Sequence, residues 1–412
     1  MSALKAAAPE VVTFGCRLNI VESEELAREA RAAGEDDIVI VNTCAVTAES
    51  TRQARQRIRR LHRERPEARI IVTGCAATIA PQDFARIEGV TRVVGNADKR
   101  LAASSHSDWS AASAPRAITA SEGTRGFLAV QNGCDHRCTF CVIPFGRGPS
   151  RSAPADSVIA RARELVEAGK REIVLTGVDL TSYGADLGGR ETLGTLARLL
   201  LKELPELARL RISSIDCIEA DADLIDAIAT EERLMPHLHL SLQSGDDLTL
   251  KRMKRRHSRA DAIAFCKELR ALRPDIVFGA DFIVGFPTET EEMFLRTQEL
   301  VEECGLTHLH VFPFSPRPQT PAARMPPVGG EIVKQRARQL RALGDATLTR
   351  HLAAQDGKTL RVLAERGGVA RAEDFTLVRT PGAVAGEMID ICVTGHDGAA
   401  LLTSLSPPAE KR

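Results

Sequence analysis

Residues 131–151 read QNGCDHRCTFCVIPFGRGPSR, and the three cysteines in this stretch decide how the rest of the chain is interpreted. Cys134, Cys138 and Cys141 follow a C-x3-C-x2-C spacing. Three thiolates this close in sequence can each bind one iron of a four-iron cluster, which leaves the fourth iron open to a small molecule. Structural zinc usually takes four ligands, and no nearby Cys or His supplies a convincing fourth, although His136 lies between the thiolates. Three buried free thiols are the other alternative.

The chain around this stretch predicts six successive strand–helix units. β-Branched, apolar runs occur at 127–133, 172–180, 210–216, 237–243, 277–286 and 308–314, and segments of helical period separate them. Six units are too few to close an eight-stranded barrel, so we expect an open partial barrel. Active sites of such barrels form at the carboxyl ends of the strands, and the cysteine loop follows the first strand there.

Polar residues near those strand ends are candidates for binding a cofactor and a substrate. They are Asp179 after the second strand, Ser213 and Ser214 on the third, Gln243 at the end of the fourth and Asp281 on the fifth. Each is equally consistent with an ordinary hydrogen-bonded residue of the barrel wall. Asp281 is expected to point into the barrel, because a buried charge needs partners.

Three cysteines of the N-terminal region occupy the same position in consecutive units. Cys16, Cys44 and Cys75 directly follow the predicted strands 11–15, 36–43 and 68–74, and a fourth strand is expected at 91–96. Strand–helix alternation predicts a doubly wound parallel sheet, whose carboxyl ends lie along one edge. We therefore expect the three thiols to converge, the alternative being three unrelated core cysteines.

Basic residues are concentrated locally although the formal net charge of the chain is zero. GRGPSR supplies Arg147 and Arg151, and KRMKRRHSR at 251–259 includes Arg255 and Arg256. Such runs near an active-site mouth favour contacts with nucleic-acid phosphates over solvated helix faces. A third basic run, at 51–69, is consistent with either interpretation.

The remaining segments complete a division into three domains. Residues 97–124 are rich in Ala and Ser and predict a linker between an N-terminal domain at 1–96 and the barrel domain at 125–353. After a helix at 331–353, several short strands predict a small β-barrel of OB-like build at 354–412. From 355 to 412 there are seven Lys or Arg and eight Asp or Glu, so this barrel is not basic.

The cysteine content and hydropathy predict a cytoplasmic protein. The sequence has ten cysteines and no clear export signal, which indicates metal ligation in a reducing compartment rather than disulfides. We find no uncharged apolar stretch of the length, about 18 residues, that crosses a membrane.

The cysteine loop resembles that of the radical S-adenosylmethionine (SAM) superfamily, in which a C-x3-C-x-aromatic-C motif, here with Phe140, binds a cluster whose open iron holds SAM. GCRLN, VNTC and VTGC resemble the N-terminal domain of the methylthiotransferases. The segments AEDFTLVRT and TGHDG resemble the TRAM domain that ends many methylthiotransferases. The branch of the family that modifies threonylcarbamoyladenosine is the most similar one in four sequence segments: RISSID, HLHLSLQSG, LKRMKRRHS and HVFPFSPRPQTPAARM. Gln319 departs from the Gly that is usual in the family.

The resemblance implies an enzyme that adds a methylthio group to C2 of N6-threonylcarbamoyladenosine at position 37 of tRNA, in the anticodon loop. It implies two [4Fe-4S] clusters, one on Cys134, Cys138 and Cys141 and one on Cys16, Cys44 and Cys75, with SAM and an electron donor such as flavodoxin or ferredoxin. Isopentenyladenosine in tRNA and an aspartate of a ribosomal protein are the alternative substrates. A nonenzymatic iron–sulfur RNA-binding protein is the alternative from another class.

Overall fold

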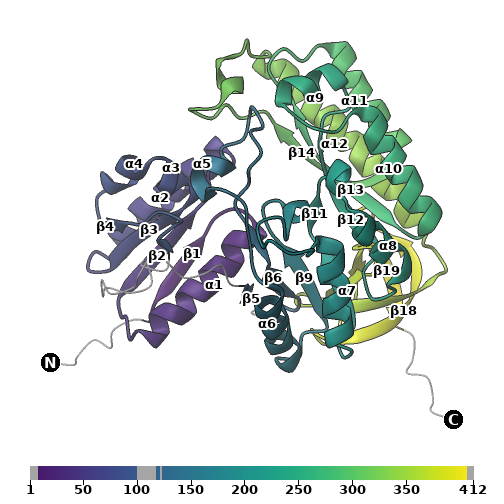
Figure 1. Ribbon diagram of the computed structural model, residues 1–412, viewed down its shortest axis with the longest axis horizontal. Coiled ribbons are helices and arrows are strands. Elements are labelled where there is room, and N and C mark those ends of the chain that lie inside the picture. The colour runs from purple at the N-terminus through teal and green to yellow at the C-terminus, as the bar shows by residue number, and fades with distance from the viewer. Residues whose placement is uncertain (1–7, 100–116, 121–122, 406–412) are drawn as a thin grey trace.

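The computed structural model describes residues 8–99, 117–120 and 123–405, and its ribbon is shown in Figure 1. The first sheet is parallel, with strand order β1-β2-β3-β4. Its strands are β1 (Glu10–Thr13), β2 (Ile38–Thr43), β3 (Arg69–Gly74) and β4 (Val90–Val93), and its helices are α1 (Arg17–Ala32), α2 (Ala48–Glu64), α3 (Cys75–Ile79) and α4 (Pro81–Ala85).

Helices cover both faces of this sheet because alternate residues of each strand point to opposite sides. Ile40 of β2 packs in one cluster with Leu26 of α1, whereas Val41 packs in another with Ile58 of α2. The predicted N-terminal parallel sheet is thus confirmed.

The central region forms a partial barrel from two sheets of four strands, ordered β10-β9-β6-β5 and β11-β12-β13-β14. The strands are β5 (Ile118–Ala120), β6 (Gly126–Ala129), β9 (Glu172–Thr176), β10 (Arg209–Ile212), β11 (Ser214–Ile215), β12 (His237–Gln243), β13 (Val277–Val284) and β14 (Leu306–Pro313). The helices are α5 (Ile143–Arg147), α6 (Ala155–Glu167), α7 (Leu193–Glu203), α8 (Ala222–Thr230), α9 (Asp247–Met253), α10 (Arg259–Leu272) and α11 (Glu291–Glu303). Except for β5, the paired strands of both sheets are parallel, as predicted.

The predicted linker at 97–124 contains a strand that the sequence did not reveal. β5 pairs antiparallel with β6, from Ile118 opposite Ala129 to Ala120 opposite Phe127. Three residues are too few to show a strand period, and pairing with β6 decides their conformation. Lys99, also within the predicted linker, is buried. Residues 100–116 and 121–122 lie outside the described part of the chain.

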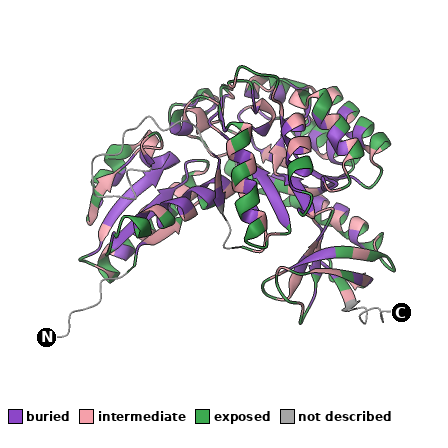
Figure 2. Cartoon of the chain, turned by 60° about the horizontal axis from the view of Figure 1, so that its bottom comes forward, coloured by how far each residue is buried: buried purple, intermediate pink, exposed green. Residues whose placement is uncertain are grey.

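The C-terminal region is a closed barrel, ordered β15-β16-β17-β19-β18. Its strands are β15 (Thr359–Glu365), β16 (Val369–Ala372), β17 (Leu377–Arg379), β18 (Met388–His396) and β19 (Leu401–Leu405), and α12 (Gly330–Ala353) leads into it. This confirms the predicted small β-barrel, although β16 was not expected. Figure 2 shows the central strands of the first two units buried and their helices exposed on the outer faces, whereas the strands of the C-terminal barrel carry buried, intermediate and exposed residues.

No helix in the described ranges combines the length and the apolar character needed to cross a membrane.

Candidate functional site

The loop that carries Cys134, Cys138 and Cys141 is fixed by backbone contacts at both of its ends. It follows β7 (Gln131–Asn132), which pairs with β8 (Arg151–Ser152). The N–H of Cys134 donates to the carbonyl of Gly148 at 3.1 Å, and the N–H of Thr139 donates to the carbonyl of Met253 at 3.0 Å. Gly133 has φ +78°, and a Cβ there would come within 1.8 Å of the Pro149 carbonyl oxygen, so only glycine fits this turn.

The three thiols of this loop fit a group that supplies positive charge. Burial raises the pKa of Cys134 to about 12 and that of Cys141 to about 11, so both thiols stay protonated until a metal displaces the protons. Two donors already point at the sulfurs. The Ile143 N–H donates to Cys141 Sγ at 3.4 Å, and Arg255 Nη1 donates to Cys138 Sγ at 3.8 Å. Three sulfurs with such donors suit an iron–sulfur cluster.

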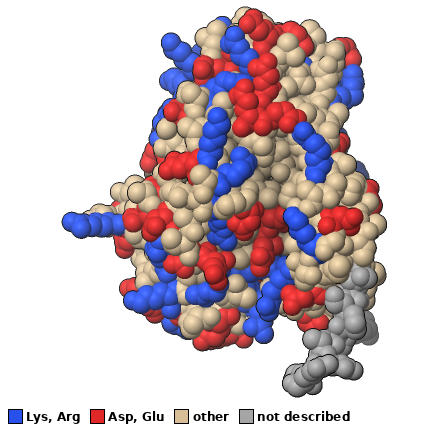
Figure 3. Space-filling model, turned by 90° about the vertical axis from the view of Figure 1, so that its right-hand side faces the viewer, with Lys and Arg blue, Asp and Glu red and all other residues tan. Residues whose placement is uncertain are grey.

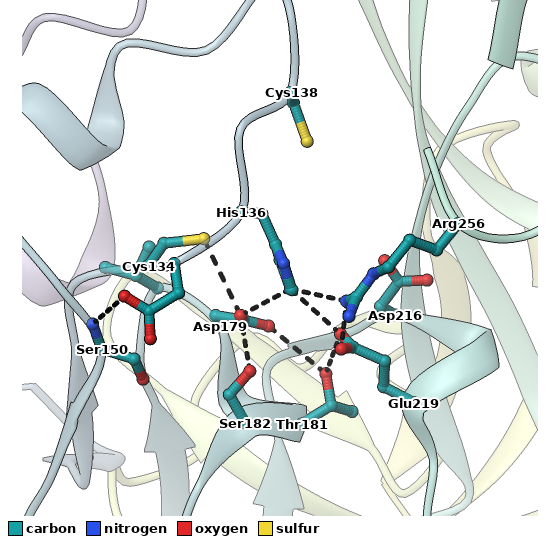
Figure 4. Close-up of polar contacts among 12 residues, drawn as sticks. Cys134, His136, Cys138, Ser150, Asp179, Thr181, Ser182, Asp216, Glu219 and Arg256 are labelled. Atoms are coloured by element: carbon teal, nitrogen blue, oxygen red, sulfur yellow. Dashed lines mark hydrogen bonds and ion pairs between the residues drawn. The ribbon is translucent and has the colours of Figure 1, made fainter. Parts of the chain in front are cut away.

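The His136 ring points toward two carboxylates, as Figure 4 shows, and its nitrogen also lies within 4.8 Å of the Cys134 sulfur. Its Nε2 lies 2.9 Å from Asp179 Oδ2 and 3.3 Å from Glu219 Oε2. The hydrogen bond with Asp179, followed by that with Glu219, raises the pKa of His136 to about 10. A metal-ligating histidine must be neutral, so these carboxylates make His136 a poor fourth ligand for zinc.

Cys16, Cys44 and Cys75 lie at the carboxyl edge of the N-terminal sheet. Cys16 caps α1, Cys44 directly follows β2 and Cys75 begins α3. Burial raises the pKa of Cys44, and the thiols of Cys16 and Cys75 are near enough to raise it further. Gly15, with φ +99°, lies against Cys44, since a Cβ there would come within 2.7 Å of the Cys44 sulfur.

Helix α5 lies between the two groups of cysteines. It directly follows the loop of Cys141 and packs on α3, where a Cβ at Gly146 would lie 3.1 Å from Cys75 Cβ. Asn96 Nδ2 donates both to Cys75 Sγ, at 3.6 Å, and to the carbonyl of Gly146. The thiols of Cys141 and Cys75 also interact electrostatically. The two cysteine groups therefore face each other across one short helix.

A buried ion pair holds this arrangement together. Arg147, the last residue of α5, donates from Nη1 to Glu22 Oε1 of α1 at 2.7 Å, and Lys99 contacts the other carboxylate oxygen. The side chains of Arg147 and Glu22 are 2% and 7% exposed. The prediction that Arg147 contacts RNA is therefore wrong, because its guanidinium is buried in an ion pair with a carboxylate of α1. Glu22 was not singled out from the sequence. Its position on the apolar face of an amphipathic helix is nevertheless a signal, because a charged residue on that face is buried and needs a partner.

Replacing Arg147 with methionine is expected to lower the free energy of unfolding by about 3–5 kcal/mol, because it leaves Glu22 buried with one cation fewer. Chemical denaturation of the metal-free protein measures the change. Arg52→Met is the matched control, since Arg52 pairs with Glu49 on the exposed surface of α2 and its loss should change nothing measurable. Equal effects of the two substitutions would contradict the assignment of a buried pair.

Arg255 likewise forms an ion pair with a side chain that is distant in sequence. Its Nη2 lies 2.7 Å from Asp216 Oδ2, and both side chains are less than a tenth exposed. Asp216, directly after β11, neutralises this guanidinium, which also lines the cavity beside the cysteine loop, so a phosphate contact of Arg255 stays a prediction. Arg151 and Arg256 are both exposed, and Arg256 pairs with Glu219.

The other predicted site residues lie at several depths of the barrel. Ser213 and Ser214 are half-buried at the junction of β10 and β11, and Gln243 ends β12 with φ +68°. Asp281 is also half-buried, and its Oδ1 is 2.8 Å from His239 Nε2 and 3.1 Å from His310 Nδ1. Phe140 packs on the apolar cluster of Met253, Phe286 and Ala322. The structure brings Asp179 to the cysteine loop but leaves Asp281 apart from it.

A cavity of about 230 Å³ opens beside the cysteine loop. It is lined by Asp135, His136, Arg137, Cys138, Lys254, Arg255 and Arg256. Arg137 and Lys254 are exposed, so the mouth is basic. On the face seen in Figure 3 the basic and acidic side chains are interspersed.

Comparison with known proteins finds two family models on this chain. "Radical SAM superfamily" matches residues 128–301 and "Uncharacterized protein family UPF0004" matches residues 9–95. The Threonylcarbamoyladenosine tRNA methylthiotransferase MtaB of Rickettsia prowazekii is 47% identical over 90% of this chain and 90% of its own length. MtaB of Bacillus subtilis is 34% identical, covering 86% and 84%.

The second group of relatives acts on another nucleoside. The tRNA-2-methylthio-N(6)-dimethylallyladenosine synthase of a Ruegeria species is 36% identical over 87% of this chain and 88% of its own length. Among solved structures, the radical S-adenosylmethionine methyltransferase TsrM of Kitasatospora setae shares the fold, with a TM-score of 0.55 at 16% identity over 74% of this chain and 70% of that one.

Proposed function

This chain belongs to the radical SAM tRNA methylthiotransferases, and from that premise we propose that it adds a methylthio group to C2 of N6-threonylcarbamoyladenosine at position 37 of tRNA. Membership of this family makes it a transferase that uses an iron–sulfur cluster and SAM and acts on tRNA. The observation that carries the choice of nucleoside is the 47% identity to an MtaB over nine-tenths of both chains. The identity to the dimethylallyladenosine synthase of the Ruegeria species is 36%.

We assign the SAM-binding cluster to Cys134, Cys138 and Cys141, and a second four-iron cluster to the sheet-edge cysteines, Cys16, Cys44 and Cys75. When bound, these groups and SAM supply the one-electron chemistry that an unactivated aromatic C–H bond requires, since acid–base catalysis offers no route to it. The packing of Gly146 against Cys75 supports this assignment, because both groups must reach one substrate base.

Side chains around the cysteine loop position it and set the charge beside it. Arg255 donates to Cys138 Sγ at 3.8 Å and so places a positive charge beside that ligand. Asp179 and Glu219 hold His136 as a cation beside the cavity. Phe140 packs on α9 and keeps the loop against the barrel. The half-buried Ser213, Ser214 and Gln243 remain candidates for SAM contacts.

The exposed cations at the cavity mouth suit the phosphates of an anticodon loop. Arg137, Lys254 and Arg256 line the cavity, and Arg151 lies at the start of β8 nearby in sequence. An anticodon loop can present a splayed base to such a cavity, which a duplex cannot do without base flipping. A cytoplasmic flavodoxin or ferredoxin is the class of electron donor that we expect.

Mass spectrometry of nucleosides from tRNA tests the proposal, with cells that have or lack this gene. We expect loss of 2-methylthio-N6-threonylcarbamoyladenosine and accumulation of its unthiolated precursor. Reintroduction of the gene should restore the product. Loss of the methylthio derivative of isopentenyladenosine instead would assign the chain to the other tRNA branch, and an unchanged tRNA profile would direct attention to ribosomal proteins.

A further inference from the structure

Three polar side chains on β12, β13 and β14 have no part in the chemistry assigned above. They are His239, Asp281 and His310, one from each strand, and Asp281 Oδ1 contacts both rings, at 2.8 Å and 3.1 Å. The residues that alternate with them, such as Phe282 and Val311, belong to the apolar core that α10 and α11 also form. The three polar side chains therefore lie on the inner face of these strands, toward the interior of the partial barrel.

This inner face becomes accessible partway along β14. His308 is half-buried, whereas the side chain of His310 is 59% exposed and Phe312 is 42% exposed. The opposite face of β14 is covered by α12, where a Cβ at Gly344 would lie 3.1 Å from the Cβ of Leu309. An accessible aromatic ring beside a polar group, on the inner face of a barrel, is typical of a surface that binds a ligand.

Phe312 lies at the level of the cysteine loop. It pairs in register with Ile283 of β13. Ile283 and Phe140, the residue before Cys141, pack on the same apolar cluster. His310 precedes Phe312 by two residues, which is about 6.6 Å along an extended strand. His310 is therefore one inward-facing position away from the level of the loop.

The segment after β14 reaches the sheet-edge cysteines. Ser315 Oγ accepts from the N–H of Ala48 at 3.2 Å, and Arg317 Nη2 donates to Thr51 Oγ1 at 3.3 Å. Thr51 in turn donates to the carbonyl of Cys44 at 3.3 Å. β14, the last strand of its sheet, thus ends between the cysteine loop and the sheet-edge cysteines (Figure 1). A base placed between the two groups of cysteines lies near the end of this strand.

Asp281 determines how His310 presents its second ring nitrogen. Burial raises the pKa of Asp281, but the hydrogen bonds with His239 and His310 outweigh it, so the net shift is downward and the carboxyl group stays ionised. The ionised oxygen keeps a proton on Nδ1 of His310 and leaves Nε2 on the opposite side of the ring. Within the described ranges Nε2 has no protein partner. An anionic group at Nε2 would favour a second proton on this ring, as Asp281 does at Nδ1.

The threonylcarbamoyl group of the proposed substrate has the charge and the length for this position. It extends from N6 of adenine through the carbamoyl carbon, an amide nitrogen and the threonine Cα, and it ends in a carboxylate. With the adenine at the level of Phe312, a chain of this length reaches the level of His310. A protonated imidazole and a carboxylate form a charge-assisted hydrogen bond, which an uncharged N6 group cannot form.

We propose that His310 donates from Nε2 to the threonyl carboxylate of the substrate and so selects it over an uncharged N6 group, with Asp281 as the positioning residue. The inference rests on the proposed function and adds the residue that recognises the nucleoside. An isopentenyl group would leave the protonated ring without an acceptor, which disfavours that nucleoside.

The test compares His310→Leu with the wild-type holoenzyme on two synthetic anticodon stem-loop RNAs. One carries N6-threonylcarbamoyladenosine at position 37, and the other carries the same nucleoside with its carboxylate converted to a carboxamide. Binding is measured with SAM and without reductant, so that no turnover occurs. We expect wild type to bind the carboxylate RNA about 10- to 100-fold more tightly than the carboxamide RNA, the value of a charge-assisted hydrogen bond. His310→Leu should lose this preference by weakening the carboxylate RNA alone.

Two further variants separate recognition from a structural role. His310→Gln, which keeps a donor without the charge, should recover part of the preference. Asp281→Asn should reduce the preference less than His310→Leu does, because its amide oxygen can still accept from Nδ1. His62→Leu is the matched control and should behave as wild type. His62 also faces a carboxylate, that of Glu88 at 3.8 Å, but it lies in the last turn of α2, away from Cys44 at the other end of that helix.

Iron content and SAM cleavage without RNA should match wild type in His310→Leu, and a raised KM for SAM would place His310 at the SAM site and overturn the inference. If His310→Leu loses its iron, His310→Gln and the wild-type preference decide. Equal losses on both RNAs, or a wild type that does not distinguish them, would also overturn the inference. A wild type that binds the carboxylate RNA but never methylthiolates it with reductant would instead refute the proposed function.

Discussion

Replacement of Cys138 by alanine is expected to abolish reductive cleavage of SAM to methionine and 5′-deoxyadenosine. Cys138 is one of the three thiols of the loop, and Arg255 already donates to its sulfur. Loss of an outer-shell partner of a metal site costs roughly 10- to 100-fold, and loss of a ligand should cost more. The measurement is anaerobic chromatography of SAM products after reconstitution with iron and sulfide.

Cys392→Ala provides the control for this substitution. Cys392 is a half-buried thiol of β18 in the C-terminal barrel, and its sulfur donates to the carbonyl of Val393 at 3.8 Å. We expect that variant to cleave SAM at the wild-type rate. SAM cleavage by Cys138→Ala at a rate near wild type would contradict the proposal that the cysteine loop holds the SAM-binding cluster.

Replacement of Cys44 by alanine is expected to abolish methylthiolation of tRNA but not the cleavage of SAM. SAM cleavage should stay within about twofold of wild type, because α5 and the ion pair of Arg147 with Glu22 remain intact. Methylthiolation of tRNA should be lost, because Cys44 lies between Cys16 and Cys75 in the strand order. Iron analysis should show the loss of one cluster, and nucleoside mass spectrometry should show unmodified substrate.

Retained methylthiolation in Cys44→Ala would contradict the assignment of a second cluster to the sheet edge. Loss of both activities would show that the two sites are not separable. Circular dichroism distinguishes that result from simple unfolding. The iron content of Cys138→Ala gives the reciprocal measurement, since the sheet-edge cysteines are intact in that variant.

The cysteine motifs of the chain could be predicted from the sequence because their spacing by itself indicates metal ligation. The C-x3-C-x2-C loop, and a cysteine after each of three strands, predict metal ligation before any contact is known. Strand and helix periodicity likewise predicted the parallel sheet, the partial barrel and the small β-barrel in order. These features depend on residues near one another in sequence or on a repeat of fixed period.

The charged residues were predicted less well, for a physical reason. Arg147 and Arg255 belong to basic runs, but Glu22 and Asp216, distant in sequence, bury and neutralise them. Whether a charge faces solvent depends on what packs against it, and a single sequence does not state this.

The sequence by itself determined the cysteine chemistry, the order of the three domains and the resemblance to one enzyme family. Only the tertiary structure decided which arginines are free to bind an anion, because that depends on long-range ion pairs. Arg151 stays exposed, whereas Arg147, four residues earlier in the same basic run, is buried against Glu22 of α1. Metal-ligand sets follow from short-range spacing, whereas the exposure of a charge follows from the partners that folding brings to it.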